Sequence, residues 1–255
     1  MASTLNGKFV WYELTTPAAP DARRFYGAVL GWDSRDAQVP GIDYSLMSAS
    51  GADVAGFLAL QDGMQAGWLG YICVDDLDAA FAKAQQGGAA TCVPINPIPG
   101  VGRFALMTDP TGGFFGLLEY LDEFPKPTVP THGTHGHGWW RELHTTDQEK
   151  AFAFYSGQFG WVKADAMDMG PMGVYQVVAP QDGDPNGAMF NDAGRPPFWL
   201  FYFWVADIDV AHDAVLAHGG KVVNGPMEVP GGAWVFEGRD PQGLTFALVG
   251  DRTKK

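Results

Sequence analysis

One stretch of eight residues occurs twice in this chain of 255 residues, and it limits the possible folds more than any other feature. Residues 25–32 read FYGAVLGW and residues 154–161 read FYSGQFGW, a spacing of 129. In both copies the apolar side chains follow the 3.6-residue period of an amphipathic helix, and a glycine stands where helices often end in the left-handed conformation. The tryptophan that follows can pack back over the helix end. A shared helix, stop and anchor indicate an internal duplication.

The duplication also decides how many domains to expect. A chain of this length can form one large domain or two of ordinary size, and the repeat favours two. The hydrophobic fraction of 46% is ample for two cores. We predict a first module at 8–122, a linker at 123–137 and a second module at 138–251. The linker is predicted because 124–138 contains three prolines and three histidines and has no periodicity.

Within each module the pattern predicts a strand, a helix and three strands, twice over. In the first module strands are expected at 8–14, 43–48, 53–60, 68–74, 90–93, 103–108 and 114–120, with helices ending at Gly31 and spanning 76–86. In the second module strands are expected at 139–144, 174–178, 187–190 and 198–205, with helices ending at Gly160 and spanning 207–218. This order predicts an α+β fold of four βαβββ units, in which two curved mixed sheets carry helices outside. The concave side of such a sheet is where a ligand would bind.

Charge and composition exclude several classes of partner. The formal net charge is −13, so nucleic acid and anionic membrane surfaces would be repelled. Cys73 and Cys92 form no disulfide or metal framework and suit a reducing compartment. The N-terminus lacks the apolar region of a signal peptide, and the longest apolar run, 198–206, is too short to cross a bilayer. We therefore expect a cytoplasmic protein, monomeric or homodimeric.

The repeated motifs resemble the vicinal oxygen chelate superfamily, which includes glyoxalase I, bleomycin-resistance proteins and extradiol dioxygenases. The first set of motifs consists of Phe25-Tyr26 with Leu30-Gly31, the segment 74–78 and the turn Asp109-Pro110-Thr111-Gly112. The second set consists of Phe154-Tyr155 with Phe159-Gly160, the segment 205–209 and the turn Asp240-Pro241-Gln242-Gly243. Together they cover nearly the whole chain, and the tandem form looks most like bacterial glyoxalase-like proteins. The resemblance implies the fold but no single function, because this fold hosts isomerases, dioxygenases, thiol transferases and drug-binding proteins.

Enzymes of that superfamily usually hold one divalent metal ion with His and Glu ligands on the concave side. Matched motif by motif, the ligand positions in this chain hold Trp11, Leu69, Gly116, Trp140, Leu200 and Ala247. None of these side chains can ligate a divalent ion. We therefore predict no metal and no other cofactor, and a divalent metal bound by atypical ligands is the alternative.

Two glutamates are the sharpest candidates for chemistry. Glu13 and Glu142 match across the repeat and lie two residues beyond Trp11 and Trp140, so each shares one side of its strand with that tryptophan. Three roles stay open for them. They could form ion pairs with an arginine such as Arg103, they could accept hydrogen bonds from a ligand amine or hydroxyl, or they could act as general bases.

We call the concave side of each module its cup. His144 adds a second ionisable side chain to the cup of the second module, which the cup of the first module lacks. His144 follows Glu142 on the same side of the strand, where the first module has Thr15. A lone strand histidine is more often a satisfied structural residue than a base or ligand. The candidate catalytic residues are accordingly Glu142, His144 and Glu13, and the asymmetry places the predicted ligand site in the second cup.

Aromatic residues complete the predicted ligand-binding set. That set comprises Trp11, Glu13, Trp140, Glu142, His144, Tyr202 and Trp204. For Tyr202 and Trp204, core packing and stacking against a flat organic ligand are equally open. His132, His135 and His137 could gather a metal, but an exposed linker is the better interpretation of their glycine-rich surroundings.

The residues and the resemblance together predict a small-molecule-binding protein of the glyoxalase and bleomycin-resistance type. Its ligand would be a small organic molecule bound in an aromatic-lined cup without the standard metal site. The alternative is a glyoxalase-like lyase, isomerase or oxygenase. Such an enzyme would use atypical metal ligands or acid–base catalysis by Glu142 and His144.

Overall fold

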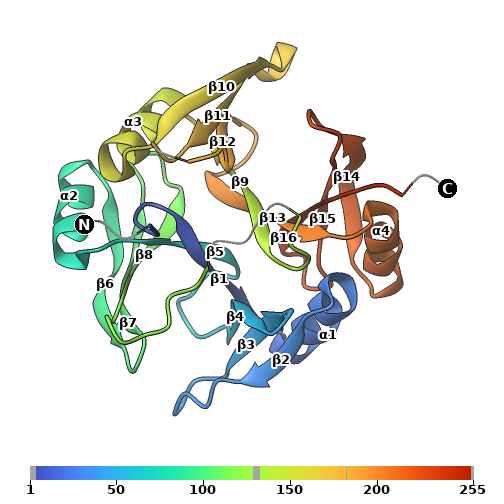
Figure 1. The fold of residues 1–255 in the computed structure, drawn as a ribbon, viewed down its shortest axis with the longest axis horizontal. Coiled ribbons are helices and arrows are strands. Elements are labelled where there is room, and N and C mark those ends of the chain that lie inside the picture. The colour runs from blue at the N-terminus through green and yellow to red at the C-terminus, as the bar shows by residue number, and fades with distance from the viewer. Residues whose placement is uncertain (1–3, 129–132, 182, 254–255) are drawn as a thin grey trace. The chain divides into compact units, whose positions relative to one another are not determined.

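A computed structural model describes residues 4–128, 133–181 and 183–253 of the chain, and its elements follow the repeat (Figure 1). The first half contains β1 (Phe9–Thr16), α1 (Ala19–Leu30), β2 (Asp33–Asp36), β3 (Tyr44–Ala49), β4 (Ala52–Ala59), β5 (Gly67–Cys73), α2 (Leu77–Gln86), β6 (Ala90–Ile98), β7 (Gly102–Thr108) and β8 (Phe114–Tyr120). The second half contains β9 (Gly138–Thr145), α3 (Gln148–Phe159), β10 (Val162–Asp168), a 3-10 turn (Gly170–Met172), β11 (Val174–Ala179), β12 (Gly187–Asn191), β13 (Phe198–Val205), α4 (Ile208–Ala217), β14 (Lys221–Glu228), β15 (Trp234–Arg239) and β16 (Thr245–Gly250). The predicted α+β fold of βαβββ units is confirmed.

Local sequence explains where the helices begin and end. Gly31 and Gly160 close α1 and α3 with φ angles of 68° and 73°, which lie in the left-handed region that glycine enters without steric cost. The N-termini of α2, α3 and α4 are capped by Asp76, Asp147 and Asp207. Each of these side chains accepts a hydrogen bond from a backbone N–H group of the first turn. The predicted helix stops are therefore present in the structure.

Each half of the chain contributes one mixed sheet. The strand order is β2-β3-β4-β1-β5-β8-β7-β6 in the first sheet and β10-β11-β12-β9-β13-β16-β15-β14 in the second. The sequence did not predict β2 and β10, which lie at sheet edges. All residues of β2 are exposed, and in β10 only Met167 is partly covered, so neither strand has the apolar alternation that a buried face imposes.

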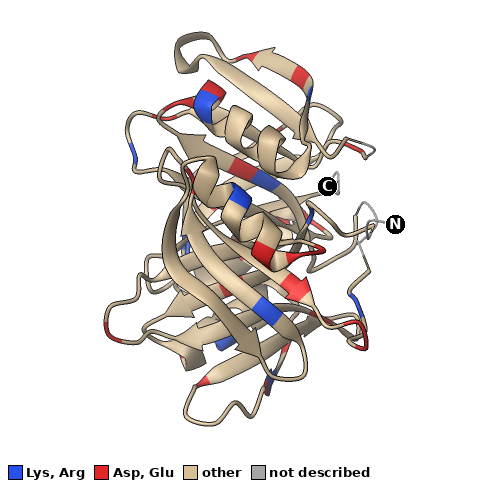
Figure 2. Cartoon of the chain, turned by 90° about the vertical axis from the view of Figure 1, so that its left-hand side faces the viewer, with Lys and Arg blue, Asp and Glu red and all other residues tan. Residues whose placement is uncertain are grey.

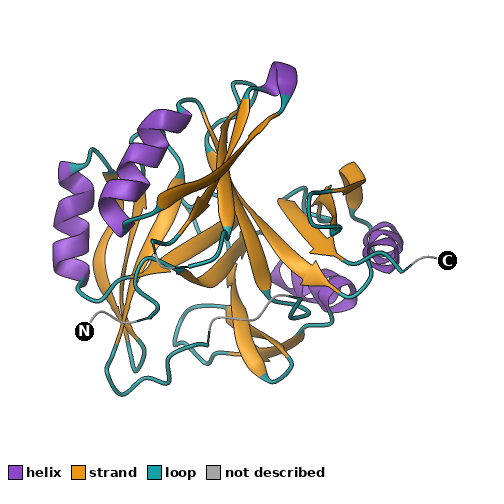
Figure 3. Ribbon diagram, turned by 45° about the horizontal axis from the view of Figure 1, so that its top comes forward, coloured by secondary structure: helices purple, strands orange, loops and turns teal. Residues whose placement is uncertain are grey.

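The compact units of the structure combine strands from both halves. Unit 1 consists of Met1–Val10, Leu69–Val129 and Arg141–Trp199, and unit 2 consists of Trp11–Trp68, Pro130–Trp140 and Leu200–Lys255. In unit 1, α2 lies beside α3 (Figures 1 and 3). Gln158 Nε2 donates a 2.7 Å hydrogen bond to the backbone oxygen of Ala80. In unit 2, α1 lies beside α4. Each unit therefore pairs βαβββ elements of one half with those of the other, while the module boundaries at 8–122 and 138–251 stay a prediction.

Inside unit 1, the Phe-Tyr motif of the second half meets the Asp-Pro turn of the first half. Tyr155 Oη donates a 3.0 Å hydrogen bond to Asp109 Oδ2 and accepts one of 3.0 Å from Trp199 Nε1. Phe154 packs edge-on against Phe115 with ring centroids 5.8 Å apart. Burial, and then the charge of Asp109, raise the pKa of Tyr155 well above its usual range, so the hydroxyl remains a donor.

Inside unit 2, the Phe-Tyr motif comes from the first half and the Asp-Pro turn from the second half. Tyr26 Oη lies 3.4 Å from Asp240 Oδ2 and accepts a 3.1 Å hydrogen bond from Trp68 Nε1. Phe25 packs edge-on against Phe246 with ring centroids 5.6 Å apart. The repeated motifs that carried the resemblance therefore build the cores of the two units.

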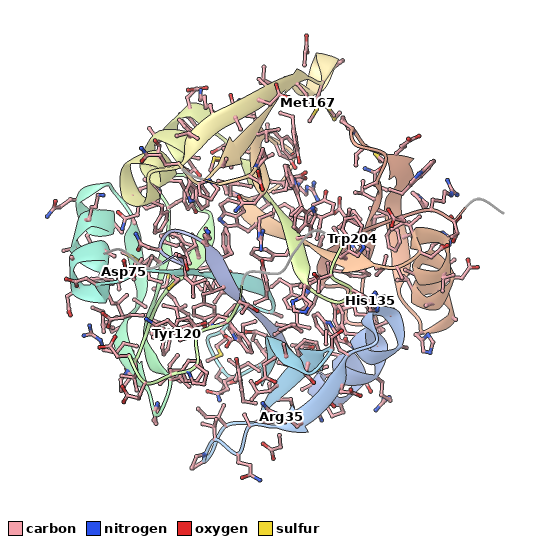
Figure 4. All side chains as sticks on the ribbon, viewed as in Figure 1. Arg35, Asp75, Tyr120, His135, Met167 and Trp204 are labelled. Atoms are coloured by element: carbon pink, nitrogen blue, oxygen red, sulfur yellow. The ribbon has the colours of Figure 1, made fainter. Side chains whose placement is uncertain are left out.

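The glycine-rich segment before β9 differs from the exposed linker that the sequence predicts. Gly136 is buried; its N–H group donates to the backbone oxygen of Trp204 at 2.8 Å, and its oxygen accepts from Trp32 Nε1 at 2.7 Å. The segment is therefore held against β13, where Figure 4 labels Trp204 and His135. These hydrogen bonds offset part of the conformational entropy that the segment loses when its backbone is fixed.

The three histidines predicted to lie in that linker have different environments. His135 is exposed, as expected for a linker. His137 is half-buried, and burial, followed by the charge of His135, lowers its pKa below the usual range. His132 lies outside the described residues.

No helix in the described parts of the chain is long and apolar enough to cross a membrane. On the side drawn in Figure 2, Lys and Arg are scattered singly among Asp and Glu.

Candidate functional site

The candidate site of unit 1 begins on one face of β9. Glu142 and His144 alternate with Leu143 along the strand, so their side chains share a face. Both are buried, with 8% and 2% of their surfaces exposed. The neighbouring strand β12 places Ala188 opposite Glu142 and Phe190 opposite His144, and so extends this face sideways.

Both ring nitrogens of His144 lie close to a carboxylate. Nε2 is 2.9 Å from Glu142 Oε1, and Nδ1 is 2.9 Å from Asp192 Oδ2. The Nδ1 contact has hydrogen-bond geometry, whereas Nε2 has no hydrogen-bond partner among the described residues. Nε2 therefore lies close to Glu142 Oε1, but the geometry of this 2.9 Å contact does not meet that of a hydrogen bond. A buried ring nitrogen without a partner is uncommon, because the lost hydration is not replaced.

Arg195 holds Asp192 in place beneath the imidazole. Arg195 Nε donates a 2.8 Å hydrogen bond to Asp192 Oδ2, and Arg195 Nη2 lies 2.9 Å from Nδ1 of His144. Partial burial raises the pKa of Asp192, but hydrogen bonds from His144, Arg195 and the Gly194 amide outweigh it and lower the value to about 2. Asp192 is therefore an ionised carboxylate at neutral pH.

Aromatic rings surround the charged groups. Phe198 stacks on the imidazole of His144 with centroids 4.3 Å apart, and Phe190 meets it edge-on at 4.5 Å. Tyr175 Oη donates a 2.7 Å hydrogen bond to Glu142 Oε2, and Met167, labelled in Figure 4, lies opposite Tyr175 in the ladder of β10 and β11. A carboxylate, an imidazole and flat rings thus share one surface, which suits recognition of a flat polar molecule.

Three members of this cluster were not predicted. Asp192 and Arg195 lie in the loop between β12 and β13, where the sequence has no periodic pattern, so nothing in it pointed to them. Tyr175 could have been found, because Tyr44 stands at the matching place in the first half. Arg103, the example of an arginine partner that the sequence suggested, pairs with Glu119 at 2.6 Å.

The matching face in unit 2 is arranged differently. Glu13 is half-exposed, and Tyr44 accepts a 3.1 Å hydrogen bond from Trp11 Nε1. The ring of Tyr44 lies over Gly56, where an added Cβ would overlap the hydroxyl. In the second half Ala188 takes the ladder position that Gly56 has in the first, so a Cβ is present where Gly56 has none.

The other predicted ligand-binding residues belong to unit 2. They are Trp11, Glu13, Trp140, Tyr202 and Trp204, whereas Glu142 and His144 belong to unit 1. Phe203 on β13 packs against Tyr12 with centroids 5.6 Å apart, so Tyr202 and Trp204 occupy the opposite face of that strand. Trp204 is 3% exposed and meets Trp139 edge-on at 6.3 Å. The structure thus brings Glu142 and His144 together, and Trp204 belongs to a separate aromatic cluster.

The residues at the superfamily's metal positions do not fit a divalent ion. The ring of Tyr71 lies over Gly116, where any added side chain would overlap it. Glu119, three residues further along β8, is already bound to Arg103 and to the backbone N–H group of Leu77. Among the described residues no group of three or more His, Cys, Asp and Glu side chains could hold a metal.

The cluster around His144 does not supply such a site either. Glu142 and Asp192 lie at opposite nitrogens of the imidazole ring, which point away from each other. The two carboxylates therefore cannot join this histidine on one ion.

Comparisons with known proteins identify the family. Residues 140–248 match the Glyoxalase/Bleomycin resistance protein/Dioxygenase superfamily. Over 246 residues, 94% of this chain and 93% of the relative, the chain is 32% identical to a Mycobacterium tuberculosis (strain CDC 1551 / Oshkosh) protein named "Putative glyoxylase CFP32". Over 268 residues, 95% and 93% of the two chains, it is 28% identical to the anthracycline biosynthesis protein DnrV of Streptomyces peucetius.

A solved structure supports the same fold. The Mn(II)-bound glyoxalase of Novosphingobium aromaticivorans superposes with a TM-score of 0.69 at 16% identity, covering 99% of this chain and 84% of that one. The 32% identity with the Mycobacterium tuberculosis relative, together with the family match, shows that the chain belongs to the glyoxalase, bleomycin resistance protein and dioxygenase superfamily, as the repeated motifs predicted. Members of this superfamily bind small organic substrates and are often oligomeric.

Proposed function

We propose that this chain binds a small, flat organic molecule on the face of β9 that carries Glu142 and His144, and that no metal ion mediates the binding. The observation that carries the proposal is the buried polar cluster itself. Burying the Glu142 carboxylate and the His144 imidazole costs free energy that an apolar strand face would not incur. A ligand group that bonds to the unpartnered Nε2 of His144 would offset part of that cost.

The surroundings of the cluster favour an aromatic or conjugated ligand. Phe190, Phe198 and Tyr175 contribute ring surfaces, and Glu142 contributes acceptor oxygens at the same place. Flat ligands gain dispersion and burial from such rings, while one directed hydrogen bond fixes their orientation. An anthracycline is a sensible first compound to screen, because the relative DnrV is named for anthracycline biosynthesis.

A pair of matched substitutions tests this proposal. A panel of hydroxylated and aminated aromatic compounds is titrated by calorimetry into the wild-type chain, Glu142→Gln and Glu13→Gln. Losing a hydrogen bond to a charged group costs about 1.5–3 kcal/mol, so Glu142→Gln should weaken the best ligand by roughly 10- to 100-fold. Glu13→Gln, at the matching place in the repeat, should change affinity less than about threefold. Equal effects, or none from Glu142→Gln, would count against the proposed site.

An enzymatic function is the second candidate, and one relative and one contact favour it. The 32% identical relative carries the name glyoxylase, and Glu142 lies within 2.9 Å of His144, as an acid–base pair requires. A metal-free acid–base enzyme should turn over its ligand and lose turnover in both Glu142→Gln and His144→Gln.

Measuring the metal content of the purified protein distinguishes these two metal-free proposals from a metalloenzyme. Untagged protein purified without added metal should carry well under one equivalent of Zn, Fe, Mn or Ni by elemental analysis. A variant lacking His132, His135 and His137 controls for binding by the histidine-rich segment. If this variant still binds one equivalent of metal, the result would support a metalloenzyme with atypical ligands.

A further inference from the structure

One row of side chains crosses four strands of unit 1, from β9 to the sheet edge at β10. Phe190 lies opposite His144 in the ladder of β12 and β9. Met167 lies opposite Tyr175 in the ladder of β10 and β11. The rings of Tyr175 and Phe190, on the neighbouring strands β11 and β12, have centroids 5.8 Å apart and join the two pairs. We call these four residues the β9–β10 row. Because neighbouring strands lie ~4.8 Å apart, the row is about 14 Å long.

The β9–β10 row lies on the face of the sheet that α3 does not cover. The residues that alternate with it along the strands are buried, and they are Leu143, Met189 and Gln176. On the same face as Gln176, Lys163 Nζ donates a 2.7 Å hydrogen bond to Glu149 of α3, so the helix covers that side. The row therefore points away from the helix, to the side where the superfamily fold leaves room for a ligand.

Solvent exposure changes along the β9–β10 row. His144 at its inner end is 2% exposed, and its Nε2 has no hydrogen-bond partner among the described residues. The other three residues are half-buried. Met167 at the outer end, labelled in Figure 4, is the one residue of β10 that is partly covered. The row thus connects a buried polar end to an accessible apolar track that stops at the sheet edge.

The corresponding row of the first half differs at both ends. Thr15 pairs with Leu58, and Leu58 pairs with Tyr44. The fourth position is Ala37, whose N–H group donates to the backbone oxygen of Tyr44 at 2.9 Å. Tyr44 also leaves the row, because its ring lies over Gly56. A threonine and an alanine thus stand where the second half has the imidazole and the thioether, so the first half offers neither end of the track.

We propose that the β9–β10 row is an extended binding subsite for a flat molecule of three or more fused rings, whose polar group reaches Glu142 and His144 while its last ring lies against Met167. This inference rests on the proposed binding function and names its ligand class. The rings of Phe190 and Tyr175 favour aromatic surface, and a thioether adapts its shape to a ring and contacts it favourably. A ligand of two rings reaches the polar end but leaves Met167 uncovered.

Two fluorescent compounds that differ by one ring test the length of the subsite. 2-Naphthol has two fused rings and 2-anthrol has three, and both carry a hydroxyl group at one end of a flat molecule. In fluorescence titrations of the full chain, Met167→Ala should weaken 2-anthrol at least about fivefold and 2-naphthol less than about twofold. Glu142→Gln should weaken both compounds. Met227→Ala, which shortens an exposed methionine on the edge strand β14, is the matched control and should change neither affinity.

Carbon-13 NMR of the methionine methyl groups detects the contact itself. The chain has nine methionines, and the signal lost in Met167→Ala assigns Met167; Met167→Leu serves the same purpose if that variant does not fold. 2-Anthrol should shift this signal in the wild-type chain through the ring current of its last ring, whereas 2-naphthol should leave it in place.

The outcomes distinguish the extended subsite from the binding function on which it rests. Binding of 2-anthrol without a shift of the Met167 signal, or equal weakening of both compounds in Met167→Ala, overturns the extended subsite while the binding function stands. If neither compound binds, or if Glu142→Gln weakens neither, the proposed binding site fails and the extended subsite fails with it.

Discussion

Removing the hydroxyl of Tyr155 should destabilise unit 1 more than the same change at Tyr26 destabilises unit 2. Tyr155 is fully buried, and its hydroxyl bonds to Asp109 and Trp199 at 3.0 Å each. In Tyr155→Phe the buried Asp109 loses a donor, which costs about 1.5–3 kcal/mol, and Trp199 Nε1 loses its acceptor, which costs about 1–3 kcal/mol. Since some relaxation is expected, the free energy of unfolding should fall by about 3–5 kcal/mol.

Tyr26→Phe supplies the matched control in the same chain. The hydroxyl of Tyr26 lies 3.4 Å from Asp240, which is beyond the usual range for two oxygens, and Trp68 is only half-buried. Water can therefore replace the acceptor that Trp68 loses, and the cost should be about 1–2 kcal/mol.

Urea unfolding of both variants, followed by tryptophan fluorescence and far-ultraviolet circular dichroism, measures the difference. Two probes are needed because the units can unfold in separate steps, and the free energies are comparable only when each step is two-state. A loss below about 1 kcal/mol in Tyr155→Phe, or a larger loss in Tyr26→Phe, would refute the reasoning from hydrogen-bond length and burial.

Three further predictions follow from single side chains. Phe154→Ala should cost about 3–5 kcal/mol by urea unfolding, and less than about 1 kcal/mol would mean that this helix face is not a core face. Because folding lowers the pKa of Asp192 from 3.8 to about 2, its stabilising contribution should be present above pH 3.8 and disappear as the pH falls towards 2. Asp192→Asn should flatten the stability curve in that window, and an unchanged curve would contradict the hydrogen-bonded carboxylate. Gly56→Ala should displace Tyr44 and free the indole N–H group of Trp11, seen as a faster hydrogen exchange of that group, and an unchanged rate would show that the ring does not lie over Gly56.

The sequence predicted the bounds of some buried strands well and missed two exposed edge strands. The predicted bounds of β8 and β13, 114–120 and 198–205, coincide with the structure because their apolar runs end at turn residues. The strands β2 and β10 escaped prediction because edge strands exposed to water need no apolar side chains. Strand pairing in the sheet, a non-local interaction, makes them strands.

The candidate site was predicted in part for the same reason. Alternation along a strand placed Glu142 and His144 on one face, which needs no tertiary information. Asp192 and Arg195 reach the imidazole from a loop 48 and 51 residues away in the chain, and loop conformation depends on the packing around it.

The duplicated sequence by itself determined four βαβββ units and their order. It could not determine which copy of each motif pairs with which. Tyr155 and Tyr26 carry the same hydroxyl, and Asp109 and Asp240 carry the same carboxylate, so either pairing satisfies the local chemistry. Only the tertiary structure decided that Tyr155 meets Asp109 and Tyr26 meets Asp240. The physical reason is that this choice depends on the packing of α2 against α3 and of α1 against α4, which no local pattern encodes.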